Sequence, residues 1–183
     1  MNKLSFSPVI ENKDLVCYPT YNVIDNWNDP EQKRQFMVAE IDPEYAGGIE
    51  LCQKYGFNPR MGANCLVVVG VRGQTETYAA CVVPVGYRYD MSGVVRKCLN
   101  ARRVSVAPLD KVIEATDMEY GSITAIGLPK EWKIFIDPMV VEHREIIMGS
   151  GLKKSKICFP SSALLQLPNA QILEGLAIES KLK

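Results

Sequence analysis

The chain has 183 residues, of which 47% are apolar and 23% are charged, so its composition is that of a globular protein rather than a disordered one. Its 21 basic and 21 acidic side chains cancel, which argues against a protein held to nucleic acid by bulk charge. The longest apolar runs, such as residues 66–71, have the length of a strand and fall far short of the roughly 20 residues of a membrane helix. Because the N-terminus lacks a basic-then-apolar signal pattern, we expect a cytoplasmic protein.

Residues 1–30 are interrupted by Pro8, Pro19 and Pro30, and their apolar side chains favour one or two edge strands. The spacing of apolar residues over 31–39 then predicts a short helix. We expect residues 1–40 to form an N-terminal extension that packs on a domain spanning 41–178, followed by a frayed tail at 179–183. Residues 1–60 hold 6 basic and 9 acidic side chains, which makes this third a poor nucleic-acid face.

A helix is predicted to begin at Asp42, where a capping aspartate precedes Pro43, and to stop at Gly56. Gly47 and Gly48 weaken such a helix in water, which suggests close packing or a surface that faces a substrate.

From residue 64 on, the pattern alternates between strands and helices. The predicted elements are strands 65–71 and 75–83 joined into an antiparallel hairpin, helix 90–99 capped by Asp90, strand 102–107, helix 108–116, strands 132–136, 145–148 and 155–159, a helix from Pro160, and a last strand around 171–173. This balance indicates an α+β fold, with a mixed sheet and helices packed against it in one domain.

Six cysteines, at positions 17, 52, 65, 81, 98 and 158, are scattered through apolar surroundings. Zinc and redox motifs need close pairs such as C-x-x-C, and the sequence has none. We therefore interpret the cysteines as small core residues and expect neither a metal nor a cofactor. The single histidine, His143, stands between Glu142 and Arg144, a setting typical of a solvated turn.

Two glycine-containing loops are candidates for a site. The loop 118–129 turns at Gly121 and Gly127 and carries the hydroxyls of Ser122 and Thr124 between two apolar segments. Such a cluster is also ordinary turn chemistry. The turn 149–151 is compatible with a plain hairpin and with a site for a phosphate or an RNA end, formed by backbone N–H groups and by the ammonium of one of the nearby lysines, Lys153, Lys154 or Lys156.

Other familiar signatures are absent from the sequence. It has no Walker A sequence, no G-x-G-x-x-G after a strand, no H-E-x-x-H and no G-x-S-x-G. A second basic group, formed by Arg96, Lys97, Arg102 and Arg103, fits a helix C-terminus as well as a nucleic-acid contact.

The order of several short blocks is informative. Along the chain these blocks are 63–69, 101–107, 119–128, 135–137, 149–151 and 164–165. In this order they resemble the YbaK/prolyl-tRNA-synthetase-associated domain family, over roughly residues 40 to 178. The resemblance implies a mixed, partly barrel-like β-sheet flanked by helices, and a cleft for the aminoacylated 3′ end of a tRNA. Active members hydrolyse the ester of a mischarged tRNA, either inside a synthetase or as free-standing proteins.

Two positions depart from what the resemblance implies. Active members carry a lysine before the first core strand, and the matching residue here is Asn64, which keeps hydrogen bonds but loses a full charge. Their Gly-x-x-x-Pro loop is matched at Gly121, while the proline position is Ala125. Asp137 and the glycines of the 149–151 turn match.

The resemblance and the two glycine loops together suggest roles for ten residues. The catalytic group is Asn64, Gly121, Ser122 and Thr124, and the substrate-binding group is Gly127, Asp137, Gly149, Ser150, Gly151 and Lys153. In this hypothesis the backbone N–H groups of 121–124 and 149–151 polarise the ester carbonyl, so that hydrolysis needs no general base from the protein.

Three functions stay open on the sequence. The first is an aminoacyl-tRNA deacylase that edits mischarged tRNA in trans, with a tRNA 3′ end or aminoacyl group and an aminoacyl-tRNA synthetase as partners. The second is an inactive or altered binding module for a tRNA 3′ end, an amino acid or a related small molecule, which Asn64 and Ala125 favour. The third, a purely structural interaction domain, has no specific feature in its favour.

Overall fold

The structure is a computed structural model and describes residues 4–180. Its strands are β1 (Ser7–Pro8), β2 (Met37–Glu40), β3 (Ala63–Arg72), β4 (Thr75–Pro84), β5 (Tyr87–Tyr89), β6 (Arg103–Val106), β7 (Lys133–Ile136), β8 (Glu145–Gly149), β9 (Ser155–Pro160), β10 (Ala170–Ile172) and β11 (Ala177–Glu179). Its helices are α1 (Tyr18–Asp25), α2 (Pro30–Lys33), α3 (Gly48–Tyr55), α4 (Arg96–Cys98), α5 (Leu109–Thr116) and α6 (Pro138–Val141). Short 3-10 helices cover Val9–Glu11, Lys13–Leu15, Pro43–Tyr45, Pro59–Met61 and Ser161–Gln166, and a π-helical turn covers Met91–Val95.

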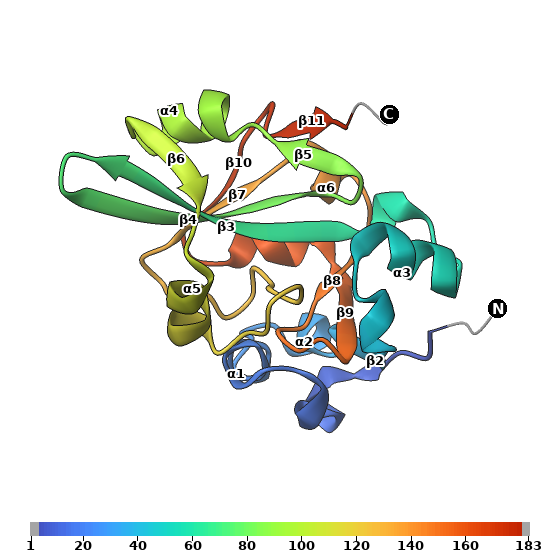
Figure 1. Cartoon of the computed structure of the whole chain (residues 1–183). Coiled ribbons are helices and arrows are strands. Elements are labelled where there is room, and N and C mark those ends of the chain that lie inside the picture. The colour runs from blue at the N-terminus through green and yellow to red at the C-terminus, as the bar shows by residue number, and fades with distance from the viewer. Residues whose placement is uncertain (1–3, 181–183) are drawn as a thin grey trace.

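Within residues 4–180 the strands form three sheets (Figure 1). Sheet A has the order β1-β2-β9-β8 and is antiparallel throughout, whereas sheet B has the order β10-β7-β4-β3-β6 and contains parallel pairs. Sheet C pairs β11 with β5. The predicted α+β fold, with a mixed sheet and flanking helices, is confirmed.

Sheet B is built on the long β3–β4 hairpin, which Figure 1 shows extending across the molecule. Its strands pair from Ala63 opposite Pro84 to Arg72 opposite Thr75, and the turn contains Gly73 with a φ of +61°. The run of β-branched residues in β3 is buried from Val67 to Gly70, as expected for a central strand. The predicted hairpin is therefore confirmed.

The main core lies between sheets A and B. It joins Phe36, Val38, Ile146 and Phe159 on the side of sheet A to Val82 on β4 of sheet B. The rings of Phe36 and Phe159 stack with their centroids 5.3 Å apart. A parallel bridge between residues 62 and 147 links the two sheets at one edge. Over the described residues the strands do not close into a barrel.

The N-terminal segment differs from the predicted edge strands, because residues 9–25 are mostly helical and only β1 is a strand. Pro19, which the sequence predicts to interrupt this segment, stands in the first turn of α1, where a missing N–H costs little. The buried residues of α1, Thr20 and Ile24, are four positions apart and so share one helix face. Here proline begins a helix rather than preventing one.

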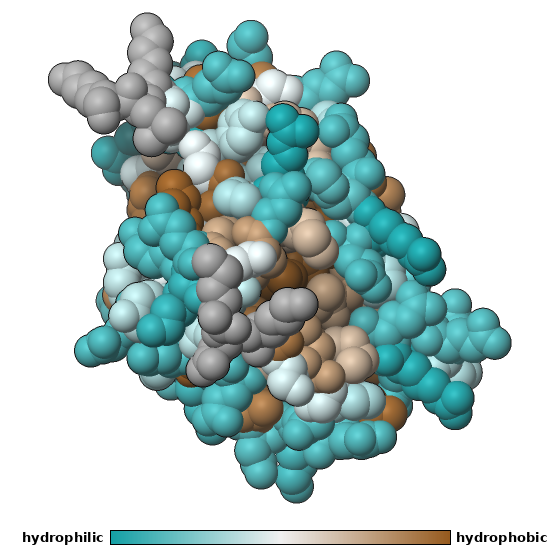
Figure 2. All heavy atoms as spheres, turned by 90° about the vertical axis from the view of Figure 1, so that its right-hand side faces the viewer, coloured by the Kyte–Doolittle hydropathy of each residue, from teal (hydrophilic) through white to brown (hydrophobic). Residues whose placement is uncertain are grey.

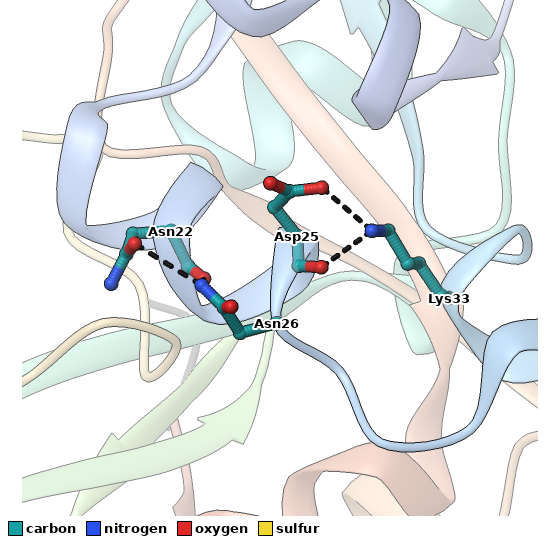
Figure 3. Close-up of polar contacts among 4 residues, drawn as sticks. All are labelled: Asn22, Asp25, Asn26 and Lys33. Carbon is teal, nitrogen blue, oxygen red and sulfur yellow. Dashed lines mark hydrogen bonds and ion pairs between the residues drawn. The ribbon is translucent and has the colours of Figure 1, made fainter.

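The prediction of a helix over 31–39 is also wrong for the second half of this range. Asp29 caps α2 by accepting hydrogen bonds from two backbone amides, and α2 ends at Lys33. An ion pair of 2.6 Å between Lys33 and Asp25 ties α2 back to α1 (Figure 3). The chain then extends as β2, because Val38 gains burial and pairs with Ile157 of β9. Tertiary pairing thus overrides the local helical spacing.

Three further elements differ in detail. The helix expected from Asp42 is split into a 3-10 turn and α3, which ends at Tyr55 and is followed by Gly56 with a φ of +72°. The segment expected to be a helix from Pro160 is 3-10 rather than α. Strand β11 was not predicted, since its partner β5 is remote in sequence.

Candidate functional site

A pocket with a volume of about 300 Å³ lies where α3, the start of β3, the end of β8 and the loop 120–123 meet. Its lining is mostly apolar, and it includes Leu51, Phe57, Leu66, Val85, Ile147 and Met148. Figure 2 views the molecule from the side that carries α3 in Figure 1, and a brown and tan hydrophobic area lies in the middle of this face, surrounded by hydrophilic side chains. A mostly apolar hollow with a few polar groups is typical of a small-molecule site.

Glycines let the N-terminal turn of α3 lie directly against the sheet. A Cβ on Gly48 would lie 2.8 Å from Val85 Cγ2 and 3.1 Å from Asn64 Oδ1, so a larger residue would require either the helix or these side chains to shift. Both Gly47 and Gly48 line the pocket, which agrees with the prediction that they give close packing or a surface that faces a substrate. The same close approach places the Asn64 amide beside the start of α3.

Backbone hydrogen bonds connect the segment just after β8 to the loop that contains Gly121. The amide of Gly151 donates to the carbonyl of Ser122 at 2.8 Å, and the amide of Glu119 donates to the carbonyl of Gly151 at 2.8 Å. A Cβ on Gly149 would overlap the Ser122 carbonyl oxygen, so glycine is needed for this contact. These two hydrogen bonds and the packing at Gly149 hold the loop at the edge of the pocket.

The loop offers fewer oxyanion donors than the sequence suggested. The amides of Ser122, Thr124 and Gly151 already donate, to Glu119 O, Met118 Sδ and Ser122 O. Within residues 4–180, the amides of Gly121 and Ile123 donate to no protein acceptor, and both residues line the pocket. These two N–H groups are the available donors of the loop.

Lys156, on β9, also lines the pocket. It is only 5% exposed, and burial lowers the pKa of its ammonium to about 8. Among the described residues its ammonium takes part in no ion pair. The turn 149–151 predicts a role for any one of Lys153, Lys154 and Lys156. The run Ser-Lys-Ile-Cys-Phe is otherwise typical of a buried strand, and it is the signal that distinguishes Lys156 from the other two.

Two neutral groups complete the polar lining. Burial raises the pKa of the Tyr89 phenol and of the Cys65 thiol above their ordinary values. Both groups therefore stay protonated near neutral pH and can act only as neutral hydrogen-bonding groups. Neither was singled out from the sequence, because their place in the pocket depends on sheet register.

Of the predicted site residues, the structure brings Asn64, Gly121 and Gly149 together in the lining of this pocket. They come from β3, a loop and β8, which are far apart in the sequence. The other predicted site residues do not line it, and they are Ser122, Thr124, Gly127, Asp137, Ser150, Gly151 and Lys153.

Hydroxyl groups near the loop point into the protein. Ser122 Oγ is buried and has no hydrogen-bond partner within residues 4–180. Thr124 Oγ1 accepts a hydrogen bond from the amide of Ile126 at 3.4 Å. Ser150 Oγ lies 2.7 Å from Ser155 Oγ in a buried pair. These contacts give Thr124 and Ser150 local structural partners.

The remaining predicted residues also have packing or capping contacts. Asp137 caps α6 through the amide of Met139 at 3.0 Å and holds the amide of Ala177 at 2.8 Å. A Cβ on Gly127 would lie 2.7 Å from the backbone of α1. Gly151 packs on Cys17, and Lys153 is exposed with its ammonium 5.7 Å from the centroid of the Tyr120 ring, at the edge of the pocket.

Within residues 4–180 the six cysteines are free thiols, and no group of three or more His, Cys, Asp or Glu side chains is placed to hold a metal ion. In the same range, no helix has both the length and the apolar character needed to cross a membrane.

Comparison with known proteins gives a family and several structural neighbours. The model of the aminoacyl-tRNA editing domain matches residues 43–167. A crystal structure of a proposed trans-editing enzyme for prolyl tRNA synthetase superposes with a TM-score of 0.70 at 18% identity, covering 90% of this chain and 99% of the other. The hypothetical protein APE2540 gives 0.69 at 15% identity, covering 81% and 95%. A proposed signal transduction protein from Marinobacter aquaeolei gives 0.57 at 12% identity, covering 90% and 31%. No curated protein matches the chain.

Proposed function

The chain belongs to the aminoacyl-tRNA editing domain family, and from this premise we propose that it is an aminoacyl-tRNA deacylase that hydrolyses the ester of mischarged tRNA in trans. Its site of action would be the cytoplasm, and its partners would be the 3′ end of a tRNA and an aminoacyl-tRNA synthetase.

One observation carries this proposal: Asn64, Gly121 and Gly149 line a single pocket. The volume of about 300 Å³ suits an aminoacyl group better than a whole nucleotide. Tyr120 is 64% exposed at the edge of the pocket, where an aromatic face is available for a terminal base.

The proposed reaction uses the unpaired amides of the loop. Water attacks the carbonyl carbon of the ester, and the negative charge that develops on the carbonyl oxygen accepts hydrogen bonds from the N–H groups of Gly121 and Ile123. Such donors are worth about 3 to 4 kcal/mol each when aimed at an oxyanion. When the intermediate collapses, the ester C–O bond breaks and the ribose oxygen leaves with the proton that the water has lost.

The test is a panel of tRNAs, each charged with its cognate or with a near-cognate amino acid. We expect the protein to release one or a few amino acids well above the rate in buffer. Asn64→Asp should lower kcat at least about tenfold, because it places a carboxylate beside the developing oxyanion. Asn28→Asp, an exposed loop substitution of the same type, is the matched control. Release no faster than in buffer for every tRNA would refute the proposal.

The second candidate is a binding module that does not turn its ligand over. Asn64 favours it, since the matching residue in active members is lysine. A ligand bound only by the folded state raises the Tm by mass action. A rise in Tm with uncharged tRNA or with free amino acids, together with no release in the panel, would therefore select this candidate.

A further inference from the structure

Lys156 is a buried cation, although the other lysines close to it in the sequence are exposed. It is 5% exposed, whereas Lys153 and Lys154 in the preceding turn are exposed to solvent. A lysine is rarely buried unless it is paired, because taking an ammonium out of water is costly. Lys156 lines the pocket, where a ligand could reach it.

The register of sheet A places this side chain next to the loop. Lys156 on β9 lies directly opposite Gly149 on β8, and residues directly opposite in an antiparallel pair project to the same face. On that face the carbonyls of Ser122 and Ile123 cover Gly149. The stem of Lys156 therefore lies beside the loop whose amides at 121 and 123 lack a protein acceptor.

No carboxylate neutralises this ammonium among the described residues. From the loop, Glu119 accepts a hydrogen bond from the amide of Lys153; on β2 and α3, Glu40 and Glu50 are exposed. The groups that line the pocket with it, Asn64, Cys65 and Tyr89, are neutral. A ligand oxygen that carries negative charge would be its counter-ion.

We propose that Lys156 supplies the positive charge of this pocket in place of residue 64 and stabilises the oxyanion of the scissile ester. This rests on the proposed deacylase function and adds a cation to its two amides. The ammonium donates a hydrogen bond to the carbonyl oxygen as the C=O electron pair moves onto it, and the bond weakens again when C=O reforms and the ribose oxygen leaves. The charge comes from β9 of sheet A, whereas Asn64 stands on β3 of sheet B.

The first experiment is a charge swap. Lys156→Met keeps the length of the side chain and removes the charge, and we expect kcat to fall about 100-fold with KM changed little, as for loss of one oxyanion donor. Adding Asn64→Lys to Lys156→Met should recover at least about tenfold, since the charge returns from β3. Lys130→Met, an exposed substitution of the same type, is the control.

The second experiment measures binding and does not depend on turnover. The probes are an adenosine 3′-(1-aminoethyl)phosphonate ester, which is tetrahedral and anionic, and 3′-alanylamino-3′-deoxyadenosine, which is planar and neutral. We expect Lys156→Met to weaken binding of the phosphonate about 100-fold and of the amide less than about threefold, because only the phosphonate carries the charge of the oxyanion.

The outcomes separate the two proposals. If wild-type protein hydrolyses esters and Lys156→Met matches it in both kcat and phosphonate affinity, the role of Lys156 is wrong while the deacylase function stands. If wild-type protein hydrolyses nothing but binds the phosphonate through Lys156, the deacylase function is wrong and the cation site stands. Absence of phosphonate binding by wild-type protein overturns the role of Lys156.

Discussion

At the scale of single residues, the charge of the pocket comes from a strand other than the one that carries Asn64. Asn64 on β3 is neutral, and Lys156 on β9 brings an ammonium to the same pocket. An ammonium is a point charge on a flexible stem, so its function depends on where the nitrogen lies rather than on which strand carries it. The pocket therefore holds a positive charge although Asn64 is neutral.

The burial of Lys156 predicts a pH-dependent stability. Its pKa of about 8 in the folded protein is below the ordinary 10.5, so the unfolded chain binds this proton more tightly and the charged side chain destabilises the folded state. The difference corresponds to about 3 kcal/mol, which applies in full below pH 8 and disappears as the pH rises towards 10.5. Lys156→Met should thus be more stable than wild type by up to about 3 kcal/mol at pH 7.

Urea unfolding of both proteins between pH 6.5 and 9.5 checks this prediction. The two stabilities should converge above pH 8. Burial raises the pKa values of Cys65, Cys81 and Tyr89, so these groups also make the free energy of unfolding depend on pH. They are present in both proteins, and their effect cancels in the difference between the two free energies. A difference that does not change with pH would show that the cost of burying the charge has been misjudged.

At the scale of elements, the site depends on the contact between β8 and the loop 119–123. Gly149 has no room for a Cβ against the carbonyls of Ser122 and Ile123, and backbone atoms cannot yield as the end of a flexible side chain can. The loop is therefore held by packing and by hydrogen bonds at the same point. Its two unpaired amides are fixed in advance at the edge of the pocket.

Gly149→Ala should displace this loop. We expect it to destabilise the protein by about 1–3 kcal/mol, as overpacking does, and to lower kcat at least about tenfold, because the amides at 121 and 123 move. Gly73→Ala is the comparison: it has a φ of +61° but no atom within 4 Å of the added Cβ, so it should cost about 1 kcal/mol and leave kcat unchanged. Urea unfolding and deacylation rates measure both effects. Equal kcat values for the two variants would show that the contact between Gly149 and the loop 119–123 does not position the loop amides for the reaction.

At the scale of the whole molecule, the N-terminal segment is part of the main core. Strand β2 lies between β1 and β9, and Phe36 and Val38 pack in the same cluster as Phe159 and Leu164. The family match begins at residue 43, after this segment. We propose that residues 4–40 are an extension that belongs to the same folding unit as the family domain.

A chain that starts at residue 41 should therefore not fold cooperatively. Its β9 would lose a partner strand, and Phe159 would lose the ring of Phe36 that stacks on it. A chain that starts at residue 4 is the control and should unfold in urea as the whole protein does. A sharp urea transition for the shorter chain, monitored by circular dichroism, would show that the extension is dispensable.

Local patterns in the sequence determined much of sheet B and the caps. The β3–β4 hairpin follows from two apolar runs joined by a glycine turn. Asp90 is a cap as predicted and accepts hydrogen bonds from the amides of Gly93 and Val94, but the segment predicted as one helix is a π-helical turn over Met91–Val95 followed by the short α4. These signals depend on residues close together in the chain. The α+β class and the family followed from the same patterns taken in order.

Only the tertiary structure decided which parts of the N-terminal segment are helix or strand. It also decided which residues line the pocket. Whether residues 37–40 form helix or strand depends on β9, more than 100 positions later. Tyr89 and Lys156 reach the pocket through pairings between distant strands, and the bridge from Gly62 to Ile147 brings β3 and β8 to its edge. A single sequence does not encode such distances in any local pattern, because the contacts form only when the sheets pack.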